Sequence, residues 1–137
     1  MNFKCKPKKF KHFFQGPKYS CSLLTRLRVE YSDLNAHRYK VGLSESIDCT
    51  CISNKPETSQ HFLLQCELYT EERRTLFDQI KQFIPNFHKL PLKRQYFILI
   101  FGYEPENDEM QQINTKIMKF SQKYILSTKR FETDYLG

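Results

Sequence analysis

The sequence predicts a mainly α-helical fold, a small helical domain interrupted near its middle by an irregular segment. Apolar residues recur at spacings of three and four along much of the chain after residue 22, which is the period of an amphipathic helix. Residues 44–57 break that period and contain two cysteines. At 137 residues the chain can bury one modest core, so one compact domain, or a small module with a helical appendix, is expected.

Residues 1–21 are predicted to form an extended arm in which lysines alternate with aromatic residues, because Pro7, Gly16 and Pro17 break helices. The first 40 residues hold ten of the 22 basic side chains and two of the 15 acidic ones, in a chain of net charge +7. Such an excess attracts polyanions and makes their binding sensitive to salt. The aromatic side chains of the arm can stack on unpaired bases, or they can be an old interface with a missing domain.

The region 22–69 is predicted to be a helical module. Its first helix places Leu24 and Leu27 on an apolar face, and a short second helix follows Asp33 as its N-cap. After the irregular segment, Thr58 is the expected N-cap of a third helix.

The region 70–137 is predicted to be an amphipathic helical C-terminal region. Its first helix begins at Thr70 as N-cap and ends at Pro85. Residues 92–101 are too hydrophobic for an exposed helix, and a strand over 96–101 is the alternative. A long helix from Asp108 to about residue 130 is expected to carry an apolar stripe made of Met110, Ile113, Ile117, Phe120 and Tyr124.

Three cysteines and one histidine have the spacing C-x-C-x9-H-x4-C, formed by Cys49, Cys51, His61 and Cys66. Three thiolates and an imidazole are a donor set for structural, tetrahedral Zn²⁺, so the predicted cofactor is Zn²⁺ and the predicted fold class is a small helical domain with a loop-rich structural zinc module. An ideal helix separates His61 and Cys66 by about 140°, so both reach one ion only if the helix ends or tightens before Cys66. Three buried free cysteines and a capping histidine are the alternative.

The same ligands lie in a longer run that resembles the zinc-binding (CCHC) region of non-LTR, or LINE-type, retrotransposon reverse transcriptase proteins. The resemblance covers about residues 22–75 and involves the segments Leu24-Thr-Arg-Leu-Arg28, Asp33-Leu-Asn-Ala-His37, Val41-Gly-Leu43, Cys49-Thr-Cys51, Pro56-Glu-Thr58, His61-Phe-Leu-Leu64, Cys66, Tyr69 and Glu72-Arg73. In that family the region lies C-terminal to the reverse transcriptase, or to an RNase H domain where one is present.

The resemblance implies that the three cysteines and the histidine ligate zinc and that the module binds nucleic acid during target-primed reverse transcription. It also implies that Arg26, Arg28, Asn35 and His37 lie in the associated helical segment. It does not imply an enzyme, because a polymerase needs aspartates for two Mg²⁺ ions and the chain has no adjacent Asp-Asp pair. We therefore expect a non-catalytic tail, fragment or remnant of a longer retroelement protein.

The expected partner is RNA or DNA, together with upstream retrotransposon domains, and neither a membrane nor a small-molecule substrate is expected. The candidate nucleic-acid-binding residues are the basic side chains Lys6, Lys8, Lys9, Lys11, Arg26, Arg28, Arg38 and Lys40. Without a signal peptide or a membrane-spanning run, an intracellular location in the nucleus or cytoplasm is expected.

Two other functions stay open. The chain can belong to a longer polyprotein with RNA-directed DNA polymerase activity. It can also be a zinc-scaffolded protein-interaction module, which an exposed patch of Phe97, Ile100, Phe120 and Tyr124 would favour.

Overall fold

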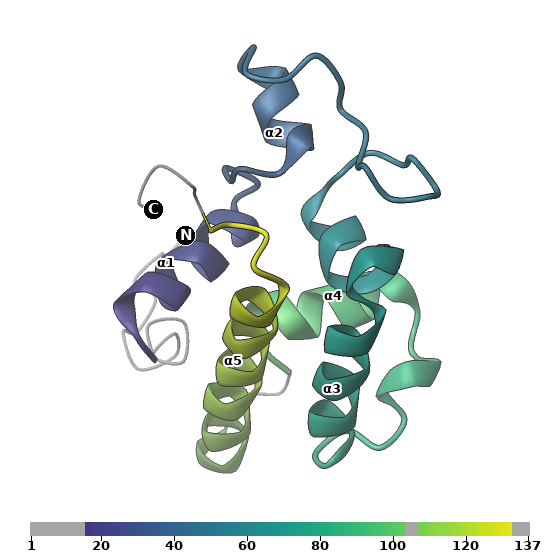
Figure 1. Cartoon of the computed structure of the whole chain (residues 1–137). Coiled ribbons are helices and arrows are strands. Elements are labelled where there is room, and N and C mark those ends of the chain that lie inside the picture. Colours follow the sequence, from purple (N-terminus) through teal and green to yellow (C-terminus); the bar gives the residue numbers. More distant parts are fainter. Residues whose placement is uncertain (1–15, 104–106, 133–137) are drawn as a thin grey trace, which may run out of the picture.

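The computed structural model describes residues 16–103 and 107–132 of the chain. In these two stretches the chain forms five α-helices, three short helical turns and a single isolated bridge in place of any strand. In chain order (Figure 1) they are α1 (Lys18–Arg28), α2 (Asn35–Lys40), η2 (His61–Gln65), η3 (Glu67–Tyr69), α3 (Thr70–Lys81), η4 (Phe87–Lys89), α4 (Leu92–Phe101) and α5 (Asp108–Thr128).

The mainly α-helical prediction is confirmed. The strand considered over residues 96–101 is wrong, because these residues lie within α4. No helix in the part of the chain that the structure describes is long and apolar enough to cross a membrane.

The predicted basic arm lies mostly outside the described residues, and with it Lys6, Lys8, Lys9 and Lys11. Its last residues are helical, since α1 begins at Lys18, four residues before the expected start. Pro17 precedes this helix instead of breaking it, and its carbonyl accepts the N–H of Cys21 (2.9 Å). Proline is tolerated at a helix start because the first N–H groups have no partner within the helix.

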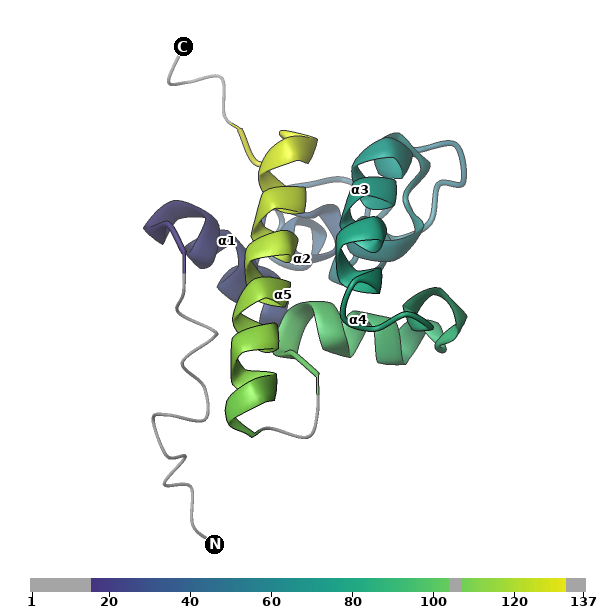
Figure 2. The ribbon, with the colours of Figure 1, turned by 90° about the horizontal axis from the view of Figure 1, so that it is seen from below.

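The core forms where α5 packs against α1, α3 and α4. Figure 2 shows α5 between α1 and α3, with α4 running crosswise to them. One continuous apolar cluster joins these four helices with η2 and η4; its most deeply buried members are Leu24, Leu27, Phe62, Leu63, Leu76, Ile80, Phe87, Ile98, Leu99, Ile100, Ile117 and Met118.

Helix α5 buries polar side chains as well as apolar ones. Of its predicted stripe, Ile117 and Tyr124 are buried, while the other three residues are partly exposed. Asn114 takes part in the packing by bonding both backbone groups of Tyr103, at 2.7 and 3.1 Å, and the Ser121 hydroxyl donates to the carbonyl of Leu99 (2.8 Å). The buried side chains of Asn114 and Ser121 thus have hydrogen-bond partners, as a stable core requires.

The predicted helix starts agree with the structure in part. Thr58 is confirmed, because its hydroxyl oxygen accepts the N–H of His61 (3.1 Å). The prediction that Asp33 is the N-cap of α2 is wrong, since Leu34 occupies that position and its side chain forms no capping hydrogen bond. The prediction that Thr70 is the N-cap of α3 is also wrong. Thr70 is the first residue of the helix, and its hydroxyl donates to the carbonyl of Glu67 (2.9 Å).

We expect Phe87→Ala to lower the free energy of unfolding by about 3–5 kcal/mol, because a large cavity would replace a fully buried ring. That ring packs edge-on against Phe77, with ring centroids 4.9 Å apart. The matched control is Phe97→Ala on α4. Phe97 is 46% exposed, so this substitution should lower the free energy of unfolding by about 1 kcal/mol or less. Urea unfolding followed by circular dichroism measures both, and equal losses would contradict this core.

Candidate metal centre

Cys49 and Cys51 lie in a tight loop between two short antiparallel segments. Cys49 N–H donates to the carbonyl of Lys55 (2.8 Å), and Glu57 N–H donates to that of Ile47 (2.9 Å). The chain turns through Asn54, whose φ is 50° and whose N–H donates to the carbonyl of Cys51 (3.1 Å). In the amide orientation that satisfies its hydrogen bonds, the Asn54 side chain donates to the carbonyls of both cysteines, so the short C-x-C spacing is held closed.

His61 and Cys66 lie at the two ends of one wide helical turn. Residues 61–65 form a π-turn, in which Cys66 N–H donates to the carbonyl of His61 (2.8 Å). An i→i+5 bond closes a wider turn than the i→i+4 bond of an α-helix. The expectation that the helix ends or tightens before Cys66 is met by its ending: the last turn widens, the helix stops at Gln65, and Cys66 has an extended backbone.

The four predicted ligand residues come together in one buried cluster. Their ligand atoms all lie within 4.8 Å of one another, so the cluster can hold a metal ion. Cys49 Sγ is 3.7 Å from Cys66 Sγ, and Cys51 Sγ is 3.4 Å from His61 Nε2. The sulfur–sulfur distance is far longer than the roughly 2.05 Å of a disulfide.

Burial governs the protonation of most of these groups when no cation is present. It raises the pKa of Cys49 to about 12 and also raises the pKa of Cys66. Burial lowers the pKa of His61, which favours the neutral ring. The pKa of Cys51 is lowered, because hydrogen bonds with Ser53 outweigh the effect of burial; the Ser53 hydroxyl lies 3.1 Å from its sulfur.

Arg73 of α3 holds the carbonyls at the C-terminal end of the π-turn. Its guanidinium donates to the carbonyl of Leu63 (3.0 Å) and to that of Cys66 (2.7 Å). The Tyr124 hydroxyl of α5 donates to the carbonyl of Phe62 (2.5 Å). The carbonyl of Cys66 also accepts the N–H of Tyr69 (3.3 Å). Those of Phe62 and Leu63 lie in the last turn, where a helix leaves carbonyls without partners, so α5 and α3 supply their donors.

Glu57 connects the cysteine loop to the rest of the fold. Its carboxylate accepts two hydrogen bonds from Arg130, each 2.8 Å, and one from the backbone N–H of Asn35 (2.8 Å). Its Oε2 atom also lies 3.9 Å from Cys49 Sγ. Hydrogen bonding to this carboxylate raises the pKa of Arg130.

The described candidates for nucleic-acid binding differ in their surroundings. Arg26 and Lys40 are exposed, and Arg38 donates to the carbonyl of Leu43 (3.0 Å) at the surface. Arg28 lies between helices: its Nε donates to the carbonyl of Ile100 (2.9 Å), and burial lowers its pKa. Arg28 therefore fastens α1 to α4, unlike the exposed basic residues.

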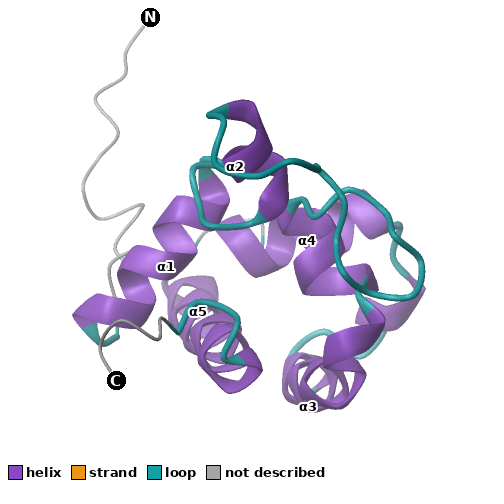
Figure 3. Ribbon diagram, turned by 45° about the horizontal axis from the view of Figure 1, so that its top comes forward, coloured by secondary structure: helices purple, strands orange, loops and turns teal. Residues whose placement is uncertain are grey.

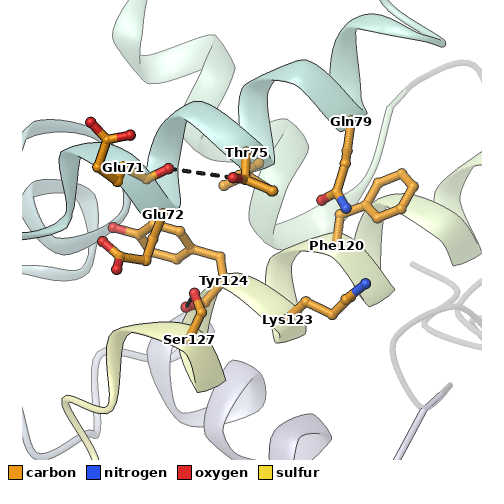
Figure 4. Close-up of a pocket in the computed structure, with 9 residues that line it drawn as sticks. Glu71, Glu72, Thr75, Gln79, Phe120, Lys123, Tyr124 and Ser127 are labelled. Carbon is orange, nitrogen blue, oxygen red and sulfur yellow. Dashed lines mark hydrogen bonds between the residues drawn. The ribbon is translucent and has the colours of Figure 1, made fainter.

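A separate hollow lies between α3 and α5, away from the cysteine cluster. It is lined by Glu71, Glu72, Thr75, Leu76, Gln79, Phe120, Lys123, Tyr124 and Ser127 (Figure 4). The exposed patch that would favour a protein-interaction module does not form, because Ile100 and Tyr124 are buried in the core.

Four residues around the cluster have roles that the sequence did not reveal: Glu57, Arg73, Tyr124 and Arg130. Glu57 and Arg73 fall within the segments that resemble the retrotransposon region, which is the only signal that could have pointed to them. Nothing in the sequence links Tyr124 or Arg130 to cysteines more than 55 residues earlier.

Comparisons of the chain with protein-family models, curated proteins and solved structures gave no match. The geometry and chemistry of the cluster therefore carry the functional interpretation.

We expect Arg130→Met to destabilise the protein by about 3–5 kcal/mol, because it leaves the buried carboxylate of Glu57 unpaired. The matched control is Arg74→Met, which removes the exposed pair with Glu71 and should cost about 1 kcal/mol or less. Chemical denaturation of both variants at neutral pH gives the comparison. If both lose the same stability, Glu57 does not depend on Arg130.

Proposed function

We propose that the chain is a zinc-binding module in which Cys49, Cys51, His61 and Cys66 hold one structural Zn²⁺. The observation that carries this proposal is the pair of distances across the cluster. Ligands at about 2.3 Å (sulfur) and 2.0–2.1 Å (nitrogen) form a tetrahedron with S···S edges of about 3.8 Å and S···N edges of about 3.6 Å. The corresponding distances here are 3.7 and 3.4 Å.

The donor set supports a structural site. All four positions of a tetrahedron are taken by protein side chains, whereas catalytic zinc keeps one position for water or substrate. The His61 ring presents Nε2 to the sulfur cluster, 3.4 Å from Cys51 Sγ. Its other nitrogen, Nδ1, is buried and has no hydrogen-bond partner, so coordination through Nε2 would fix the ring.

Zinc would join two pieces of chain that the backbone alone leaves separate. Cys49 and Cys51 come from the loop, and His61 and Cys66 come from the π-turn. A bound cation stabilises the thiolates that burial otherwise disfavours, so metal binding contributes to folding. In this proposal the metal is scaffolding for the surface that surrounds it.

We propose further that this module binds nucleic acid without catalysis of its own. Support comes from the basic first third of the chain and from its resemblance to the zinc-binding region of non-LTR retrotransposon proteins. Among the described residues, Arg26 and Lys40 supply exposed charge. Membership of a longer polyprotein with polymerase activity is the alternative, and sequence upstream of Met1 decides it.

The zinc proposal predicts about one zinc per purified chain, measured by elemental mass spectrometry. Cys66→Ser should lose the metal and lower the thermal midpoint, because one buried ligand is gone. Cys21→Ser is the matched control, since Cys21 lies in α1 outside the cluster, and it should keep the metal. A Cys66→Ser variant that still binds stoichiometric zinc would refute the site.

The nucleic-acid proposal predicts affinity that falls steeply between about 50 and 200 mM salt. Replacing Arg26 and Lys40 together by Gln should weaken binding. The slope of log K against the logarithm of the salt concentration should become less steep by about 0.7–0.9 for each phosphate contact that is lost. Replacing the exposed Lys81 and Lys93, which the proposal leaves out, removes the same charge and should have a smaller effect. Fluorescence anisotropy of a labelled oligonucleotide measures all three proteins, and binding that salt does not change would refute the proposal.

A further inference from the structure

The C-terminal end of α1 turns the chain sharply and leaves Tyr31 exposed. Tyr31 N–H donates to the carbonyl of Arg26 (2.9 Å) and Glu30 N–H to that of Leu27 (3.1 Å), the paired bonds of a Schellman motif. Glu30 takes the left-handed position, with φ 56°, where glycine is usual. The residue after it often packs back on its helix, yet Tyr31 is 66% exposed.

The Tyr31 ring rests against His37 of α2. Their ring centroids are 4.2 Å apart and the planes are inclined by 42°. Helix α2 contains no buried residue and lies apart from α3 and α5, beyond the end of α1 (Figure 1). Lys40 is exposed three residues after His37, on the same side of α2. The tyrosine ring is thus supported on one side, while most of its surface faces solvent.

A shallow hollow lies along the outer face of α1. Lys18 and Arg26, both in its lining, are eight residues or about 12 Å apart along the helix. The described residues that line it include no carboxylate; they are Gly16, Lys18, Cys21, Ser22, Thr25 and Arg26. The backbone of Arg26, which lines the hollow, bonds directly to that of Tyr31.

Two acidic residues flank the tyrosine in the sequence. Glu30 is exposed, and its charge adds to the effect of burial in raising the pKa of Tyr96 of α4. Asp33 is exposed, and its carbonyl accepts a hydrogen bond from Arg130 (3.1 Å). The three exposed cations Lys18, Arg26 and Lys40 outnumber these two carboxylates.

We propose that this surface, made of Lys18, Arg26, Tyr31, His37 and Lys40, binds single-stranded nucleic acid with one base stacked on Tyr31. The inference rests on the proposed nucleic-acid function and names the class of nucleic acid that the module takes. The three cations neutralise phosphates, and the solvent-facing side of the tyrosine ring accepts the base, since every base has an aromatic face. His37 fixes the ring from behind, so that little side-chain freedom is lost on binding.

Single strands fit this surface better than duplexes do. The bases of a duplex are stacked on one another and offer no free face to a protruding ring, whereas unpaired bases do. A protein partner would use the apolar area of the Tyr31 side chain and would not need an aromatic face, so the Tyr31→Leu variant separates these two cases.

The test is the affinity of the full chain for a labelled oligo(dT) or oligo(U) of about 15 nucleotides, measured by fluorescence anisotropy. Tyr31→Leu keeps an apolar side chain but removes the aromatic face, and it should weaken binding at least fivefold, the lower end of what one stacked base contributes. Tyr31→Phe keeps the ring and should bind like the unchanged protein. Tyr39→Leu is the matched control, because Tyr39 is 52% exposed but lies two residues after His37, on another side of α2.

A hairpin duplex of comparable length is titrated in parallel, and its affinity should not change in Tyr31→Leu. If the unchanged chain binds the single strand in a salt-sensitive way and Tyr31→Leu binds equally well, the stacking site is refuted and the nucleic-acid function stands. An equal loss for Tyr31→Phe, or an equal loss on the duplex, also refutes it. If the chain binds neither oligonucleotide at low salt, the stacking site and the nucleic-acid function fall together.

Discussion

The burial of the Glu57 carboxylate is the constraint on which the arrangement of the metal centre and of α2 depends. This side chain is 3% exposed, and an ionised carboxylate in such a place must be paired. Its partners come from three parts of the chain: the backbone of Asn35 at the start of α2, the Arg130 guanidinium after α5, and the cysteine loop itself. Because α2 buries no residue of its own, these polar contacts, with the anchoring of Leu34 in the core, hold it in place.

The π-turn creates a second dependence between the metal centre and the helices. It brings His61 and Cys66 into one cluster, and the carbonyls of Leu63 and Phe62 in this turn accept hydrogen bonds from Arg73 and Tyr124. Phe62, between the two ligands, packs its ring 5.4 Å from those of Tyr69, Tyr124 and Phe131. The ligands therefore lie against the helical core, and the metal-binding segment belongs to the same apolar cluster as α3, α4 and α5. Figure 3 shows, in teal, the loop that leads from α2 towards α3.

This arrangement separates the proposed role of the buried cluster from that of the exposed surface on α1 and α2. The cysteines and His61 are buried and cannot touch a macromolecule, so their contribution is to fix the loop that carries Glu57 and thereby α2. The aromatic and basic side chains proposed to contact nucleic acid lie on α1, on α2 and on the turn between them. A scaffold of this kind allows an exposed ring such as Tyr31 to keep a fixed direction, which lowers the entropy lost on binding.

The sequence by itself determined the helical class, the order of most helices and the four residues of the cluster. Periodicity, proline positions and ligand spacing are local signals, and each of these features is local. The tertiary structure decided the rest. Arg28 shares its charge and helix with Arg26, and only the packing of α4 shows that its guanidinium binds the Ile100 carbonyl. Asp33 has a good capping side chain, yet it is Glu57, 24 residues later, whose carboxylate accepts the first N–H of α2, that of Asn35. Arg130 pairs with Glu57, 73 residues away in the sequence. A buried charge needs an oppositely charged partner, and which residue supplies it depends on the tertiary fold and not on spacing along the chain.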